Sequence, residues 1–264
     1  MEGVIKVAEG KELLCNLKVL YIEDEEVARN ELSVFLKRRV GRLYTAKDGR
    51  EGLGIFRENK PDLVITDLRM PEMDGFQFIE EIRKIGSHCP IIITSALSDN
   101  ESIIKTVDLG IVKYVIKPLN TNDLISCMEK LAIDILKNEM GKTIIKEATL
   151  LDKESKQEVE KRLKGEIAAF LKSLTGKGPR DIQVFIKGNK IEVKTVGALT
   201  LLELNLIANK RNYSLVDYNR KLFYMENALL LEGKLGEVIA SPVKLVEVST
   251  DSSTNTEEIL FSIL

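Results

Sequence analysis

The chain has 264 residues, enough for a sizeable core and, on length alone, for two domains. Its 39 basic and 41 acidic residues leave a net charge of −2, which gives no general attraction to nucleic acid or to an anionic membrane. The longest apolar runs, such as 89–96, are too short to span a bilayer, and charges interrupt residues 1–20 too often for a secretion signal. We therefore expect a cytoplasmic protein without membrane insertion.

The few cysteine and histidine residues limit the kinds of active site and metal site that the chain can form. The three cysteines (Cys15, Cys89 and Cys127) lie in apolar surroundings, which favours buried free thiols in a reducing compartment over disulfides or a metal site. The single histidine, His88, precedes Pro90 in an expected loop. A histidine-based active site beyond residue 88 is therefore excluded.

Residues 17–137 alternate between short apolar runs and segments of helical periodicity, after a charged lead over 1–16 that has no clear period. The apolar runs predict strands over 17–22, 42–46, 62–67, 90–95 and 112–116. Helices are expected after each of them, near 27–36, 49–59, 76–82, 103–110 and 120–137. Because the strands are apolar throughout, the pattern predicts an α/β domain with a five-stranded parallel sheet and helices on both faces.

Polar residues stand at the carboxyl ends of four of these strands, which meet at one edge of a parallel sheet. They are Glu23 and Asp24, then Asp67, then Thr94 and Ser95, and finally Lys117. Three carboxylates brought close together repel one another unless one is protonated or a hard divalent cation lies between them. With Mg²⁺, a lysine and a hydroxyl, such a set would neutralise the oxygens of a transferring phosphoryl group. The acceptor would be a carboxylate, because no histidine is available.

Residues 17–137 resemble the receiver domain of two-component response regulators, which has a flavodoxin-like sheet. The segment Asp67-Leu-Arg-Met-Pro-Glu-Met-Asp-Gly and the pair Lys117-Pro118 carry the resemblance. It implies that Asp67 is the phosphoacceptor, that Glu23 and Asp24 are the acidic pair that binds Mg²⁺ with it, and that Lys117 precedes a cis-proline. A sensor histidine kinase is then the implied phosphoryl donor.

The same resemblance assigns a switch and a fourth metal ligand. Ser95 is favoured over Thr94 as the switch hydroxyl, because it directly precedes the small Ala96 and lies 22 residues before the lysine. Tyr114 matches the aromatic residue that turns inward on phosphorylation, although an ordinary core role fits it almost as well. The backbone carbonyl of Arg69 would ligate the metal, and its side chain lies where the family tunes dephosphorylation. Family members often dimerise through the last helices of the receiver. Such a domain is not an enzyme beyond the transfer to, and hydrolysis from, its own Asp67.

The second half of the chain reads as a linker over 138–154 and a small α+β domain over 155–264. A Ser155-x-x-Glu158 capping box begins a helix that extends to Leu174. Alternating residues on either side of Gly188-Asn189 predict a hairpin, followed by a short helix over 200–208 and a longer one over 214–239. Two further strands around 246–248 and 259–263, separated by a polar turn over 251–255, complete an antiparallel sheet.

Motifs in this half are mostly absent. No Walker-type loop, Cys/His metal cluster or cyclase signature occurs, and residues 152–264 hold 17 basic and 16 acidic residues, without the basic excess of a DNA-binding domain. The run 176–180 (Gly-Lys-Gly-Pro-Arg) could cradle an anion, but a helix-to-strand turn is the preferred interpretation.

Residues 155–264 also resemble a known small domain, the MpsC-type domain of poorly described function. The turn over 176–181, with Gly176, Gly178, Pro179 and Asp181, the hairpin after it and the polar segment 246–254 carry this resemblance. No catalytic residues come with it. The helix over 213–239 is more apolar here than is usual in that family, so its partner surface is expected to differ.

The leading hypothesis is a response regulator whose output domain acts on a protein partner of unknown identity. The alternative is a transcriptional regulator with an atypical DNA-binding output, and the third is an enzyme with a phosphorylation-gated output. The absence of histidine, cysteine and paired-carboxylate motifs beyond residue 137 disfavours the third.

Overall fold

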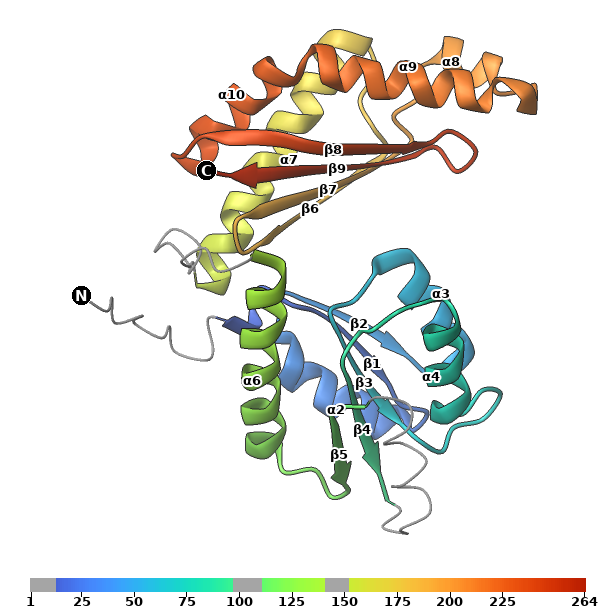
Figure 1. The fold of residues 1–264 in the computed structure, drawn as a ribbon, viewed down its shortest axis with the longest axis vertical. Helices are drawn as coiled ribbons and strands as arrows, with labels where there is room; N and C mark the ends of the chain where they lie inside the picture. Colours follow the sequence, from blue (N-terminus) through green and yellow to red (C-terminus); the bar gives the residue numbers. More distant parts are fainter. Residues whose placement is uncertain (1–12, 97–110, 141–151) are drawn as a thin grey trace. The chain divides into compact units, whose positions relative to one another are not determined.

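The computed structural model describes residues 13–96, 111–140 and 152–264 (Figure 1). The chain divides into two compact units, residues 1–143 and 144–264, and each is described by itself. The helix expected over 103–110 and most of the expected linker lie outside the described residues.

The N-terminal unit is built on a five-stranded parallel sheet of order β2-β1-β3-β4-β5. Its strands are β1 (Lys18–Ile22), β2 (Arg42–Ala46), β3 (Leu63–Asp67), β4 (Ile91–Ser95) and β5 (Lys113–Ile116). The described helices are α2 (Glu26–Lys37), α3 (Gly49–Asn59), α4 (Gly75–Lys84) and α6 (Thr121–Met140), with α3 and α4 on one face of the sheet and α2 and α6 on the other (Figure 1). The predicted parallel α/β fold is confirmed.

Burial explains why β3 and β4 carry no alternating pattern. All five residues of each strand are buried, including the polar residues that end them, Asp67 and Ser95. Strands covered on both faces favour continuous apolar runs. The two central strands therefore deliver a carboxylate and a hydroxyl to the same edge of the sheet.

Local capping fixes the helices that face this edge. The Asp48 side chain accepts a hydrogen bond from Glu51 N and begins α3. Helix α3 ends at Asn59, and the next residue, Lys60, adopts a left-handed conformation (φ 47°) directly before Pro61, where proline disfavours helical geometry. Asp74 and Gln77 form a reciprocal capping box at the start of α4.

The end of the charged lead, residues 13–16, belongs to the core of this unit. Leu13 and Leu14 are buried. The backbone N–H of Gly41 donates to the carbonyl oxygens of Leu14 and Leu17, at 3.2 and 3.1 Å. This contact ties the segment before β1 to the segment before β2.

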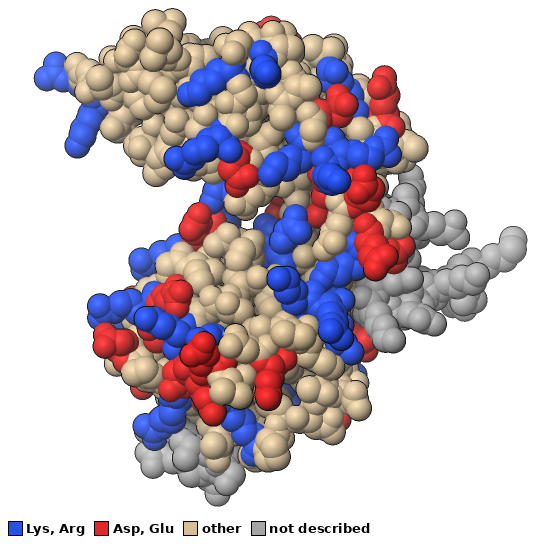
Figure 2. Space-filling view, turned by 180° about the vertical axis from the view of Figure 1, so that it is seen from behind, with Lys and Arg blue, Asp and Glu red and all other residues tan. Residues whose placement is uncertain are grey.

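The C-terminal unit is an α+β domain with a four-stranded antiparallel sheet, as predicted. Its elements are α7 (Lys153–Thr175), β6 (Asp181–Lys187), β7 (Lys190–Val196), α8 (Leu201–Leu206), a 3₁₀ turn (Lys210–Asn212), α9 (Tyr213–Glu226), α10 (Ala228–Ile239), β8 (Val243–Asp251) and β9 (Thr256–Ile263). The strand order is β6-β7-β9-β8, and α7, α9 and α10 lie together over one face (Figure 1). Basic and acidic side chains both occur on the face of this unit seen in Figure 2.

Three predicted details of this unit are corrected. Helix α7 begins at Lys153, because the Asp152 side chain caps it by accepting from Glu154 N and Ser155 N, so Ser155 is not the cap. The single helix expected over 214–239 is two helices that meet at Asn227, whose side-chain amide donates to Phe223 O. A bulge between Leu245 and Glu247 leaves Val246 exposed while Val248 packs in the core.

Candidate functional site

Three carboxylates meet at the carboxyl edge of the parallel sheet. Glu23 and Asp24 follow β1, Asp67 ends the neighbouring β3, and one oxygen from each lies within 4.8 Å of the others. Glu23 and Asp67 are buried, whereas Asp24 is exposed. The structure thus brings together the acidic residues expected to converge, with one of them open to solvent.

Lys117 neutralises part of this cluster. Its Nζ donates to both carboxylate oxygens of Glu23, at 2.9 and 2.8 Å, and to Asp67 Oδ2 at 2.5 Å. The lysine follows β5 and is joined to Pro118 by a cis peptide bond. One ammonium group therefore bridges carboxylates from two different strands.

These contacts shift the proton affinities of the pair. Burial raises the pKa of the Glu23 carboxyl, although the hydrogen bond and charge of Lys117 oppose that shift. Burial by itself would lower the pKa of the Lys117 ammonium, but the hydrogen bonds and charges of Asp67 and Glu23 raise it above its ordinary value. The lysine therefore stays charged at neutral pH.

Two residues that the sequence analysis did not single out hold the acidic pair. The buried Tyr21 donates its hydroxyl to Glu23 Oε2 at 3.1 Å. The guanidinium of Arg29, in α2, donates to the backbone carbonyls of Glu23 and Asp24 at 2.7 and 3.1 Å. Tyr21 and Glu23 are two residues apart in an extended segment and share a face, which is a signal that the sequence offers.

The two candidate switch hydroxyls end β4. Thr94 is register partner of Asp67, and its Oγ1 lies 3.4 Å from Thr66 O, to which it donates. Ser95 is buried at the last position of the strand, where its carbonyl accepts a hydrogen bond from Lys117 N at 2.8 Å. Successive residues of a strand point to opposite faces, so the two hydroxyls are directed differently. The preference for Ser95 stays a prediction.

The remaining predicted residues lie beside the cluster. Arg69 has an exposed side chain, and its backbone N–H donates to Asp67 Oδ1 at 3.2 Å. Tyr114 is half-buried on β5 and packs against the core cluster under α3 and α4. Both positions are compatible with the predicted roles.

The loop after Asp67 is packed so tightly that Gly75 has no room for a side chain. A Cβ at this position would lie 2.2 Å from the backbone oxygen of Asp67. Gly75→Ala is therefore expected to lower the free energy of unfolding by about 1 to 3 kcal/mol, because the loop must shift. Chemical denaturation measures this change.

Gly54→Ala is the matched control, because a Cβ at Gly54 meets nothing within 4 Å in the middle of α3. This variant is expected to be about 0.5 to 1 kcal/mol more stable than the wild type. Equal stability of the two variants would contradict the packing argument.

The donor set suits a hard divalent cation. Glu23, Asp24 and Asp67 offer only carboxylate oxygens, the ligand type that Mg²⁺ prefers, and the exposed Asp24 leaves one side accessible to the water molecules that Mg²⁺ retains. The structure therefore meets the chemical requirement for Mg²⁺.

Comparisons with known proteins agree with this geometry. Residues 19–129 match the family model described as the response regulator receiver domain, and residues 155–263 match the model of the Na⁺-translocating membrane potential-generating system (MpsC). The probable C4-dicarboxylate response regulator DctR of Bacillus subtilis is 33% identical over 168 residues, which cover 60% of this chain and 74% of that protein. This chain belongs to the response regulator family.

Other relatives match the response regulator over shorter stretches. The probable transcriptional regulator ycf27 of Guillardia theta is 40% identical over 107 residues, which cover 40% of this chain and 42% of that protein. The chain thus spans less than half of this relative. A solved N-terminal domain of an uncharacterized protein from Wolinella succinogenes is 32% identical, with a TM-score of 0.45, and covers 46% of this chain and 98% of that domain.

The C-terminal unit of the response regulator contains a buried polar cluster centred on Glu257. Oε1 of Glu257 accepts from Arg220 Nε at 2.6 Å, and Oε2 accepts from the hydroxyls of Tyr224 and Thr195, both at 2.6 Å. All four residues are buried, and burial with the nearby Glu257 charge raises the pKa of Tyr224 far above its ordinary value. The cluster ties α9 to β7 and β9.

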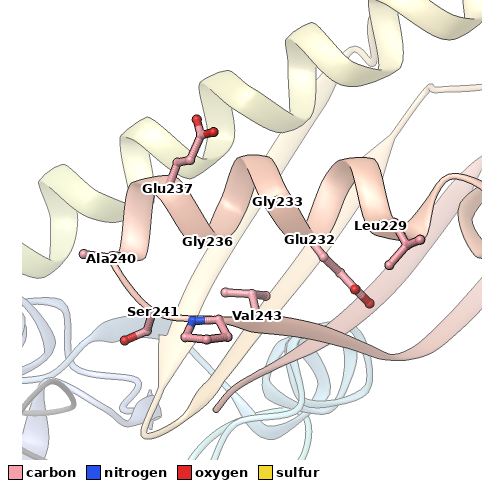
Figure 3. Close-up of a pocket in the computed structure, with 9 residues that line it drawn as sticks. Leu229, Glu232, Gly233, Gly236, Glu237, Ala240, Ser241 and Val243 are labelled. Atoms are coloured by element: carbon pink, nitrogen blue, oxygen red, sulfur yellow. The ribbon is translucent and has the colours of Figure 1, made fainter.

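A groove of about 550 Å³ lies between α10 and the start of β8 (Figure 3). Gly233 and Gly236 contribute no side chains to it, and Glu232 at its rim already accepts from Leu245 N at 2.8 Å and Lys244 Nζ at 3.3 Å. A Cβ at Gly236 would lie 3.2 Å from Ser241 O, so the glycine serves the close turn into β8. The close packing of α10 against the start of β8 thus explains the shape of the groove.

Among the described residues, no helix has the length and apolar character needed to cross a membrane.

Proposed function

We propose that this response regulator is a cytoplasmic switch, phosphorylated on Asp67 by a sensor histidine kinase, whose C-terminal unit transmits the signal by contact with another protein. The observation that carries the proposal is the Lys117 ammonium bridging Asp67 and Glu23 within the acidic cluster. A lysine so placed offsets negative charge where a phosphoryl group would add more.

The transfer requires only groups at this edge of the sheet. An oxygen of the Asp67 carboxylate attacks the phosphorus of the donor, the bond from phosphorus to the donor's leaving atom breaks, and an acyl phosphate results. Lys117 neutralises charge on the phosphoryl oxygens, and Ser95 supplies a hydrogen bond to one of them. Arg69 N, already donating to Asp67 Oδ1, holds the carboxylate in place.

Glu23, Asp24 and Asp67 would hold Mg²⁺, with the Arg69 carbonyl as the further ligand implied by the family. When bound, the ion supplies positive charge that offsets the repulsion between the carboxylates and the incoming phosphoryl group. Tyr114, half-buried beside the core, would follow Ser95 inward and change the surface of the receiver near β5 and α6. That surface is also where receiver-mediated dimerisation would occur.

A protein-contact output is favoured over DNA binding by charge. Residues 152–264 carry 17 basic and 16 acidic residues, whereas sequence-independent attraction to DNA needs a basic surface. The relative named as a transcriptional regulator matches over 107 residues, fewer than the receiver match alone spans. Salt-dependent binding of the full chain to duplex DNA would overturn this part of the proposal.

Exposure of the full chain to acetyl phosphate and Mg²⁺ tests the phosphorylation. We expect the mass to rise by one phosphoryl group, and the adduct to be removed by hydroxylamine, as an acyl phosphate is. Reduction of the adduct with borohydride before proteolysis should place it at residue 67. An unmodified chain, or a phosphoryl group mapped to another residue, would refute the proposal.

A further inference from the structure

Helix α9 has a buried inner face that packs within the C-terminal unit and an exposed outer face that is apolar. Val216, Arg220 and Tyr224 recur at a spacing of four and are buried toward the sheet. On the opposite face, the exposed fractions of Leu215, Tyr218, Leu222 and Met225 are 50, 64, 39 and 57%. Leu229, at the start of α10, continues this row with 79% exposure. We call the row from Leu215 to Leu229 the outer stripe.

The outer stripe exposes more apolar surface than is usual for a soluble monomeric protein. Leu230 on α10 and Leu201 and Leu202 on α8 add exposures of 49, 74 and 70% along the same helix layer. Monomeric proteins rarely expose contiguous apolar patches beyond a few hundred Å². Each of the five side chains of the outer stripe is at least 39% exposed, so together they leave an apolar row for a partner to cover.

The spacing of the outer stripe identifies what can cover it. Within α9, steps of three, four and three residues from Leu215 to Met225 are the a and d positions of a heptad repeat, in which helices pack side by side against each other. A row of this kind on an outer helix face is complementary to the same row of another copy, as a twofold interface requires. We propose that the outer stripe joins two copies of this chain, with α9 of one copy packed parallel to α9 of the other.

Charge on the flanks supports the parallel arrangement. With Leu222 at an a position, Lys221 occupies the preceding g position and Glu226 the following e position, and both are exposed. In parallel coiled coils, a g residue pairs with the e residue five positions later in the other chain. Lys221 of each copy would thus lie opposite Glu226 of the other, giving two attractive pairs and no like-charge contact between these positions.

Sedimentation equilibrium of the full chain tests this interface. We expect a reversible dimer, and the Leu215→Glu/Met225→Glu double variant should raise its dissociation constant by roughly a hundredfold or more. Both substituted side chains are at least half exposed, so the fold should persist, and circular dichroism checks this. Val246→Glu is the matched control, an equally exposed apolar residue on β8 outside the stripe that should leave the dissociation constant unchanged.

Charge exchange tests the orientation. Lys221→Glu and Glu226→Lys should each weaken the dimer about tenfold, because each places like charges opposite one another in both pairs. The double exchange should restore the wild-type dissociation constant. Failure of this restoration would overturn the parallel arrangement.

The interface does not depend on phosphorylation, so Asp67→Asn should dimerise like the wild type. Loss of dimerisation in Asp67→Asn, or a dimer that survives the stripe variants, would point to the receiver instead and overturn the proposal. A chain that stays monomeric would overturn it too. So would a monomer whose stripe binds vesicles of neutral or anionic phospholipid.

Discussion

Asp67→Asn is expected to abolish acyl phosphate formation while leaving the protein folded. Asparagine keeps the shape of the side chain and can still accept the hydrogen bond from Arg69 N, but its amide is not a nucleophile toward phosphorus. Lys117 retains both of its contacts with Glu23, so no buried ammonium is left unpaired. Phosphate incorporation from acetyl phosphate, measured by intact mass, should therefore fall below detection.

Asp74→Asn is the matched control for this substitution. Asp74 lies in the same loop and caps α4 by accepting from Gln77 N, a role that asparagine performs equally well. It should incorporate phosphate like the wild type. Incorporation that persists in Asp67→Asn would move the acceptor to another carboxylate, and Asp24 is the exposed one in the cluster.

The free energy of unfolding distinguishes the role of Asp67 as phosphoacceptor from its contribution to the stability of the fold. Replacing it removes one negative charge from a cluster of three, so repulsion falls while the pair between Lys117 and Glu23 remains. In the presence of a chelator, Asp67→Asn should therefore be at least as stable as the wild type. A large loss of stability would mean that the lost phosphorylation reflects misfolding.

The fold of the receiver could be predicted from the sequence because its strands and helices follow regular apolar patterns. Parallel strands buried on both faces read as unbroken apolar runs, and their carboxyl ends must share an edge. That argument alone placed Glu23, Asp67 and Lys117 in one neighbourhood. It could not give the bridging contact, because the direction of the Lys117 side chain depends on how β5 and the turn after it pack.

Three features of the structure were not predicted from the sequence, because a local irregularity interrupts the periodic pattern at each of them. The apolar row continues in phase from Leu222 through Leu229, so the sequence predicts one helix where Asn227 separates two. The bulge near Leu245 moves Val246 out of the alternation that Val248 obeys. Leu13 and Leu14 looked like part of a charged lead, because a short apolar pair has no period of its own.

The buried polar cluster of the C-terminal unit could have been predicted from the residue pattern of β9 and α9. Glu257, Ile259 and Phe261 alternate along β9, so they share a face, and the last two are core residues. A carboxylate on that face must be paired when it is buried. Arg220 stands four residues from both Val216 and Tyr224 on the inner face of α9, which makes it the candidate partner that the pattern could have named.

Glu257→Gln is expected to lower the stability of the C-terminal unit by about 3 to 5 kcal/mol. Glutamine matches glutamate in size, so packing is preserved and the change isolates charge. Arg220 is buried, its Nε donates to Glu257 at 2.6 Å, and its Nη2 has no hydrogen-bond partner among the residues that the structure describes. Loss of the carboxylate therefore leaves a buried guanidinium whose remaining anionic neighbour, Glu203, is 3.9 Å away.

Glu258→Gln provides the comparison, because the adjacent side chain points to the opposite face of β9 and is exposed. Its stability should lie within about 0.5 kcal/mol of the wild type. Urea denaturation followed by circular dichroism measures both variants, and the transition of the C-terminal unit is the one to compare. If Glu257→Gln unfolds like Glu258→Gln, the guanidinium finds water or another acceptor. The cluster would then contribute little to holding α9 against the sheet, although Arg220 and Tyr224 both donate hydrogen bonds to Glu257 on β9.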